Sequence, residues 1–176
     1  MTGHVVHMAV MGLLVSVVAP ALVLGFADTD PTPARGSVLA AVALPGFVAL
    51  HVTVTVAMHG HLEPLVGFAA QVALLLGAVL FWAPVFDGRH RLPDGIRVVY
   101  LFAAMPLLDV AGVWLVAVGD HAGGLAMIAG MLPMGLIAVG ITWRWITGEE
   151  RRAQLAETAE ATATTAWSAS ARERST

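Results

Sequence analysis

The chain has 176 residues, of which 58% are hydrophobic and 12% are charged, and its formal net charge is -3. Soluble globular domains have about 45–50% apolar and about 25% charged residues, so this composition excludes that class and predicts an integral protein of the lipid bilayer. The chain contains no cysteine, which excludes disulfides, iron–sulfur clusters and thiolate metal sites. We expect no nucleic-acid partner.

Five apolar stretches are long enough to cross the ~30 Å hydrocarbon core of a bilayer, which takes about 20 helical residues. They lie near residues 5–26, 37–58, 64–86, 96–118 and 122–146. The first has no basic leading region, so we do not expect a cleaved signal peptide. Short connections predict antiparallel neighbours. We therefore expect an all-α, polytopic transmembrane bundle of five spans over residues 1–148, and a tail over 149–176 that is helical at first and then disordered.

The first stretch carries four potential metal ligands at its start. In a helix successive residues turn by about 100°, so the four fall on one face: His4, His7, Met8 and Met11. Imidazole suits either state of copper, and thioether favours Cu(I). This spacing is also common enough to arise by chance.

The basic residues are all arginines, and they predict the orientation. They lie in the first loop, in the third loop or at the C-terminal end: Arg35, Arg89, Arg91, Arg97, Arg144, Arg151, Arg152, Arg172 and Arg174. With five spans these positions share one side of the membrane, and the positive-inside rule makes it the cytoplasm. We expect a multi-pass protein of a bacterial-type plasma membrane, with its N-terminus outside and its C-terminal tail in the cytoplasm.

The same topology puts most other imidazole, carboxylate and thioether groups near the outer face. These candidate ligands are His59, His61, Glu63, Asp120, His121 and Met127. Together with the ligands of the first helix they predict a copper site on the extracytoplasmic side. Each histidine taken singly is more often a solvated loop side chain than a metal ligand, and Asp120 is equally consistent with an N-cap of the last helix. Met127, Met131 and Met134 recur at a spacing more typical of a packing stripe.

Two polar residues lie deep within the predicted spans. Asp109 is about midway along the fourth span, where a carboxylate costs ~2.5–3.5 kcal/mol on insertion scales, so we expect it to face the bundle interior. His51 in the second span is at a depth from which it could pair with Asp109. This buried polar pair would support the outer site, pass a proton or an ion, or serve only as a structural hydrogen bond.

The last span is rich in glycine, with Ala126 and Gly130 at small-xxx-small spacing. Small residues let transmembrane helices approach closely. We therefore expect this helix to be in close contact with others.

Four colinear segments resemble a known family. They are GHVVHMAVMGLLVSVVAPALVLG, GFAAQVALLLGAVLFWAPVF, RVVYLFAAMPLLDVAGVWL and DHAGGLAMIAGMLPMGLIAVGITWRWITGEERR. In this order they resemble the CtaG family of multi-span cytochrome c oxidase assembly factors, and the match covers nearly all of residues 4–152. The chain is similar to a shortened and divergent member.

The resemblance implies roles for some of the candidate ligands. The family's His and Met positions are matched by His4, His7, Met8 and Met127, its Asp by Asp120, and its Gln is replaced by His121. A Glu-His pair of the family aligns with Ala70 and Gln71, and Asp109 has no counterpart. The nearest residues that could replace the missing pair are His59, His61 and Glu63.

These observations predict a protein that binds copper, with Cu(I) favoured, and passes it on by ligand exchange during assembly of a haem-copper oxidase. Its partners would be an oxidase subunit or a copper chaperone, with a second copy of the chain as a further possibility. We predict no catalysis. Two alternatives stay open: a b-type haem or quinone redox module that uses His51 with a histidine on a facing helix, and a structural accessory subunit without metal.

Overall fold

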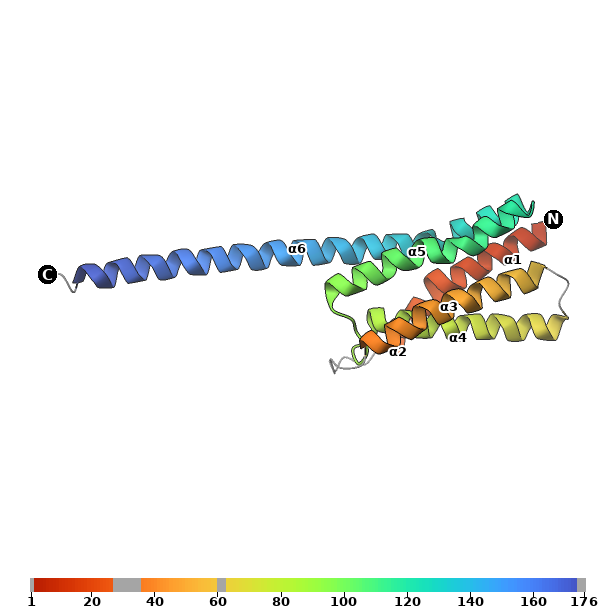
Figure 1. Cartoon of the computed structure of the whole chain (residues 1–176), viewed down its shortest axis with the longest axis horizontal. Helices are drawn as coiled ribbons and strands as arrows, with labels where there is room; N and C mark the ends of the chain where they lie inside the picture. The colour runs from red at the N-terminus through yellow and green to blue at the C-terminus, as the bar shows by residue number, and fades with distance from the viewer. Residues whose placement is uncertain (1, 27–35, 60–62, 174–176) are drawn as a thin grey trace. The chain divides into compact units, whose positions relative to one another are not determined.

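The computed structural model describes residues 2–26, 36–59 and 63–173, without the side chains of residues 2–4, 36, 165, 166 and 168–173. All regular elements of these residues are helices (Figure 1). They are α1 (Thr2–Leu13), η1 (Leu14–Val18), α2 (Ala19–Phe26), α3 (Gly36–His59), α4 (Pro64–Phe86), α5 (Asp94–Ala117) and α6 (His121–Glu173). The chain divides into unit 1, Met1–Val139, and unit 2, Gly140–Thr176.

Five helical segments are long and apolar enough to cross a membrane, as the sequence predicts. The first four are Val5–Phe26, Ser37–His59, Pro64–Phe86 and Asp94–Ala117, and the fifth begins at His121. The first four agree with the predicted spans to within two residues at each end. The chain is therefore a multi-pass helical membrane protein.

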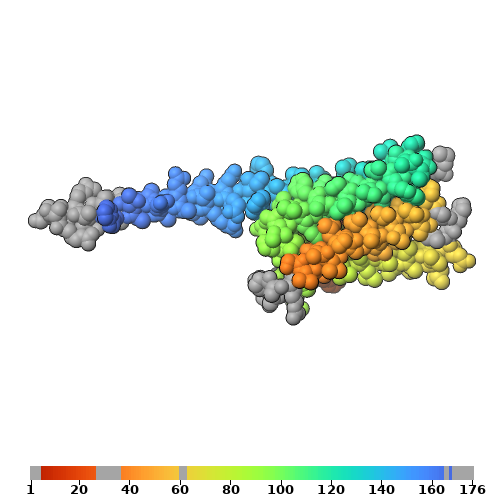
Figure 2. Space-filling model, in the orientation of Figure 1, coloured from red at the N-terminus to blue at the C-terminus, as the bar shows by residue number. Residues whose placement is uncertain are grey.

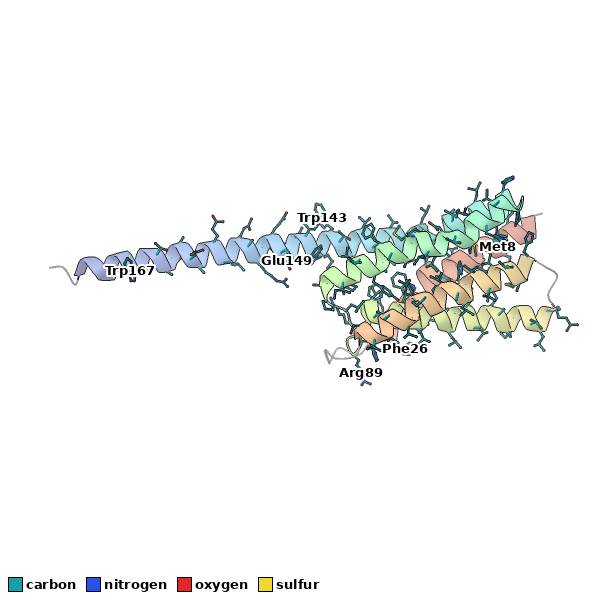
Figure 3. The ribbon with its side chains drawn as sticks, in the orientation of Figure 1. Met8, Phe26, Arg89, Trp143, Glu149 and Trp167 are labelled. Atoms are coloured by element: carbon teal, nitrogen blue, oxygen red, sulfur yellow. The ribbon has the colours of Figure 1, made fainter. Side chains whose placement is uncertain are left out.

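The helices of unit 1 run between two common ends (Figure 1). At one end α1, α4 and α6 begin and α3 and α5 finish. We call it the histidine end, after His7, His59 and His121. The other is the arginine end, after Arg89, Arg91 and Arg97. Figure 3 labels Met8 near the first end and Arg89 at the second.

The first and last spans meet through two glycines. A Cβ on Gly12 would lie 2.9 Å from both the Cα of Gly130 and the carbonyl oxygen of Met127. The Ser16 hydroxyl adds a hydrogen bond to the Gly130 carbonyl at 2.7 Å. Lipid tails are as apolar as the helices, so close packing and interhelical hydrogen bonds drive association here. The glycines therefore hold α1 against α6.

A second pair of glycines brings α5 against α6. A Cβ on Gly124 would lie 2.5 Å from the carbonyl oxygen of Gly112, and a Cβ on Gly112 would lie 2.7 Å from Cγ1 of Ile128. The predicted close contact of the glycine-rich last span with other helices is confirmed.

The first span contains a π-helical turn, η1, directly before Pro20. The Ala19 N–H reaches back to the carbonyl of Leu14, and Pro20 has no N–H to give to the next carbonyl, that of Val15. The Trp82 indole Nε1 of α4 donates to that Val15 carbonyl at 2.7 Å. A side chain from a neighbouring helix thus satisfies the backbone group that the proline leaves free, as membrane interiors require.

Aromatic rings join α3, α4 and α5 in the bundle core. The ring of Phe81 lies 5.3 Å from that of Phe47 and is stacked on Tyr100 at 5.2 Å, measured between centroids. The Tyr100 hydroxyl donates to the Phe81 carbonyl at 2.9 Å. At the arginine end Arg97 donates to the carbonyl of Val85 at 3.2 Å, where a cation complements the C-terminus of α4. These contacts fix α4 between its neighbours.

The outward faces of unit 1 are apolar. Val38, Leu80 and Val99 are 70%, 57% and 67% exposed. In Figure 2 the surfaces of α3 (orange) and α5 (green), which pack together, form much of the visible face of unit 1. Such a surface suits lipid acyl chains.

Unit 2 contains the predicted tail. The sequence predicts disorder in the later part of residues 149–176, but α6 remains helical to Glu173. Alanine, glutamate, glutamine and arginine have high helix propensity, and the hydroxyls of Thr158, Thr162 and Thr164 each bond a carbonyl four residues earlier. Residues 149–164 are exposed, so propensity rather than packing accounts for this helix.

The glycine contact between α1 and α6 predicts a clear asymmetry among Gly→Ala variants. Gly12→Ala should lower the midpoint of thermal unfolding in detergent, because its Cβ meets backbone that cannot yield cheaply, with overpacking costs of about 1–3 kcal/mol. Gly46→Ala is the matched control, since a Cβ there meets nothing within 4 Å. Equal midpoints for the two variants would show that the helices do not approach this closely.

Candidate functional site

The side-chain amide of Gln71 connects three helices near the histidine end. Its Nε2 lies 3.2 Å from Nε2 of His7 in α1 and donates to the sulfur of Met58 in α3 at 3.6 Å. An amide nitrogen only donates, so in this orientation of Gln71 the Nε2 atom of His7 is the acceptor. We call these three residues the Gln71 bridge.

In the Gln71 bridge two metal-binding atoms, His7 Nε2 and the Met58 sulfur, face the same amide NH2 group. An imidazole nitrogen and a thioether sulfur both present lone pairs to it, and these are atom types that bind Cu(I). A soft cation that displaced the amide would meet the same two lone pairs. The described residues contain no group of three or more His, Asp or Glu side chains that could hold a metal, so ligands for harder divalent ions are not gathered there.

Of the four ligands predicted in the first helix, the structure describes the side chains of three, His7, Met8 and Met11. Met8 and Met11 are fully buried, at 0% exposed, and His7 is half-buried. The thioethers therefore face the bundle interior. The side chain of His4 lies outside the described residues.

The predicted ligands between α3 and α4 do not gather into a cluster in the described part of the chain. His59 is exposed and its ring meets Trp114 of α5 edge-on, with centroids 5.6 Å apart. Glu63 is exposed and directly precedes Pro64, the first residue of α4. His61 lies outside the described residues. The ring contact of His59 explains its position without a metal.

The turn between α5 and α6 accounts for Asp120 as a helix cap. Gly119 has φ of 97°, and the N–H groups of Gly119 and Asp120 return to the carbonyls of Val116 and Leu115, which is a Schellman motif. Asp120 Oδ1 then accepts from the Gly123 N–H at 3.0 Å. Of the two roles predicted for Asp120, the N-cap is the one that the structure shows.

The remaining predicted ligands of α6 differ in their surroundings. His121 is exposed at the histidine end. Met127 is 1% exposed, and its backbone carbonyl lies against Gly12. Met131 and Met134 are also buried, at 7% and 2% exposed. The methionine series of α6 therefore packs within unit 1.

The predicted hydrogen bond between His51 and Asp109 is not formed. Both ring nitrogens of His51, which is 0% exposed, lack a hydrogen-bond partner. Asp109 lies three residues before Gly112, on the side of α5 that faces α6, and it lines a pocket with residues of α5 and α6. The helix rotation of α5 thus turns the carboxylate toward α6 instead of α3.

A second polar group without a partner, the Thr55 hydroxyl, lies one helical turn after His51 on α3. The Thr55 hydroxyl is buried and also without a hydrogen-bond partner. The two side chains lie at i and i+4 on α3, and the ring of Phe47 is 6.0 Å from that of His51. Buried polar groups are normally satisfied, so this pair marks α3 as a helix with unmet hydrogen-bonding capacity.

Two members of the Gln71 bridge were not among the predicted ligands. Gln71 is a polar residue in the otherwise apolar stretch 64–86, and that isolation is the signal in the sequence. Met58 carries only a weaker signal, its position one residue before His59. Neither signal reveals that both side chains meet His7, because that depends on how three helices are rotated.

No protein-family model, curated protein sequence or solved structure matches this chain. The functional argument therefore depends on the residues and on their geometry.

The unpartnered groups of α3 predict a gain of stability on substitution. An unsatisfied buried polar group costs about 1–3 kcal/mol, so His51→Leu should raise the midpoint of thermal unfolding in detergent. Thr55→Val, which keeps the side-chain shape, should do so as well. Phe47→Leu is the control, because it changes packing on the same helix and removes no polar group. A lower midpoint for both polar variants would show that His51 and Thr55 are satisfied.

Proposed function

We propose that this chain is a multi-pass membrane protein that binds copper as Cu(I) at its histidine end and delivers it during assembly of a haem-copper oxidase. The observation that carries the proposal is the Gln71 bridge, in which His7 and Met58 direct their lone pairs at one amide group, at 3.2 Å and 3.6 Å. The two come from different helices, so the fold and not sequence proximity brings them together.

The available donors support Cu(I) over other metals. The chain has no cysteine and eight methionines, and thioether with imidazole is a donor set that suits Cu(I). Met8 and Met11, buried on α1, add thioethers to the interior on the same helix as His7. A site of one imidazole and one thioether binds loosely enough to be exchanged, which a delivery protein requires.

The separation of charges supports an outer position for this site. The histidine end of unit 1 carries no arginine among its described residues, and the loop between α4 and α5 at the opposite end carries Arg89 and Arg91. By the positive-inside rule the arginine end is cytoplasmic. Copper is then held on the extracytoplasmic side, where an oxidase subunit or a copper chaperone would receive it. The resemblance to the CtaG family supports the same role.

In this proposal each residue of the bridge has one task. His7 supplies a nitrogen lone pair, which accepts the bond that Gln71 donates. Met58 supplies a neutral sulfur, so the site adds no charge to the interior. Gln71 fills the position between them when no ion is bound, and keeps both donors oriented.

Loss of the two donors should weaken Cu(I) binding. We expect the full chain in detergent, titrated anaerobically against a chromophoric Cu(I) chelator, to lose affinity by roughly 10-fold or more in the His7→Ala, Met58→Leu double variant. The matched control is His90→Ala, since His90 is at the arginine end and pairs with Asp87. Unchanged affinity in the double variant, or equal loss in the control, would contradict a site at the bridge.

The same preparations separate the alternatives. A Soret band that disappears with His51→Leu would favour the haem module and overturn the copper proposal. The accessory subunit would be favoured by two results together. The wild-type chain would bind no Cu(I), and the double variant would support oxidase assembly as well as wild type does. Oxidase assembled with the double variant should contain less copper per haem than oxidase assembled with the His90→Ala control.

The proposed orientation can be tested directly because the chain has no cysteine. In intact cells a membrane-impermeant maleimide should label Glu63→Cys, at the histidine end, and should label Arg89→Cys only after permeabilisation. The parent chain gives the unlabelled baseline. The reverse pattern would place the histidine end in the cytoplasm and remove delivery on the outer side.

A further inference from the structure

A pocket of about 80 Å³ lies between α5 and α6, away from the Gln71 bridge. Its lining includes one carboxylate, Asp109, and three thioethers, those of Met105, Met131 and Met134. A single water needs about 10–15 Å³, so the space is sufficient for an ion that has lost its hydration shell. All of these side chains belong to unit 1.

Asp109 is a carboxylate within a membrane span that has no partner side chain among the described residues. It is half-buried and has no hydrogen bond or ion pair among the described residues. It lies eight residues before the end of α5 at Ala117, which is about 12 Å along the helix axis. A carboxylate at this depth in a membrane is costly and characteristically marks an ion pathway or a paired site. The charge therefore calls for a partner that the described side chains do not supply.

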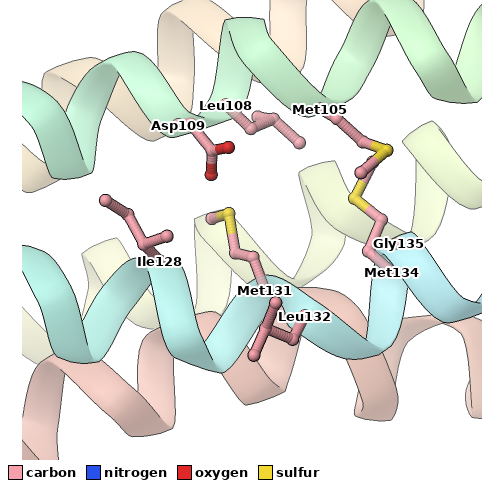
Figure 4. Close-up of a pocket in the computed structure, with 8 residues that line it drawn as sticks. All are labelled: Met105, Leu108, Asp109, Ile128, Met131, Leu132, Met134 and Gly135. Carbon is pink, nitrogen blue, oxygen red and sulfur yellow. The ribbon is translucent and has the colours of Figure 1, made fainter.

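The three methionines line the same pocket as Asp109. Figure 4 shows Met131 extending toward the side on which Asp109 lies, and Met105 and Met134 pointing toward each other. Met105 also reaches α6, since a Cβ on Gly135 would lie 3.2 Å from its terminal carbon. Met131 and Met134 are 7% and 2% exposed. Residues of two helices thus line one pocket with neutral sulfur donors and one carboxylate, and Met131 is the methionine that extends toward Asp109 (Figure 4).

We propose that this pocket is a second site for a soft monovalent cation, Cu(I) in the protein's own function and Ag(I) as its analogue. Sulfur donors select soft ions, whereas Mg²⁺ and Ca²⁺ require several oxygen ligands. One monovalent cation with one carboxylate makes a neutral complex, and neutrality is what the membrane interior favours. A divalent ion would leave a net charge there.

The site deepens the proposed function, because the ion is the same one that the Gln71 bridge would bind. The two sites share no residue, so each can be removed separately. The bridge offers one imidazole and one thioether, and the pocket offers thioethers and a carboxylate. We expect the pocket to hold copper within the membrane, and the bridge to exchange it near the surface.

The test counts Cu(I) ions bound to the full chain in detergent by anaerobic chelator titration. Wild type should bind two equivalents, and a variant combining Asp109→Asn with Met131→Leu and Met134→Leu should bind one. Asp87→Asn is the control for loss of an acidic residue elsewhere. The substitutions nearly conserve volume, which cores usually tolerate, and copper K-edge absorption gives a second readout, since the share of sulfur neighbours should fall in the triple variant.

Each outcome decides the proposal. The pocket is supported if the triple variant loses one equivalent of Cu(I) and the His7→Ala, Met58→Leu variant still binds the equivalent that the triple variant loses. If the triple variant binds as much Cu(I) as wild type, with unchanged sulfur scattering, the pocket proposal fails, and the bridge stands if its double variant loses Cu(I). If only the triple variant loses copper, the pocket stands and the bridge fails. A wild-type chain that binds no Cu(I) overturns both.

Discussion

Inside a bilayer no water is present to bond a polar group, so each such group must find its partner within the bundle. This constraint organises unit 1. The Trp82 indole takes the carbonyl that Pro20 leaves free, the Ser16 hydroxyl reaches across to Gly130, and the Tyr100 hydroxyl bonds a carbonyl of α4. Each contact joins two helices while it satisfies a group, so satisfying polar groups and assembling the helices are one process.

Against this background the unsatisfied groups are informative. His51, Thr55 and Asp109 have polar atoms without partners among the described residues, and the Oε1 atom of Gln71 is also without one. The bridge at Gln71 differs, since its donors are satisfied by a neutral amide that an ion could replace. Polar and ionisable groups inside a membrane characteristically mark the pathways of ions.

The five spans were predictable because hydropathy and length alone define a membrane crossing. The cap role of Asp120 and the contact through Gly130 also follow from local sequence. The meeting of His7 with Gln71 was not predictable, because it depends on the rotation of three helices about their axes. The His51–Asp109 prediction failed for the same reason: residue counting gives depth along a helix, but not the neighbour that a side chain faces. Membership of the CtaG family and copper binding stay predictions.

The π-helical turn at Leu14–Val18 has a consequence for the ligands before it. Such a turn fits one residue more than an α-helix into the same rise, and each α-helical residue advances by about 100°. The π-helical turn therefore rotates the segment that carries His7 and Met8 about the helix axis, relative to its position in an uninterrupted α-helix. A proline and an indole, both nearer the middle of the membrane, thus set the direction in which the imidazole points.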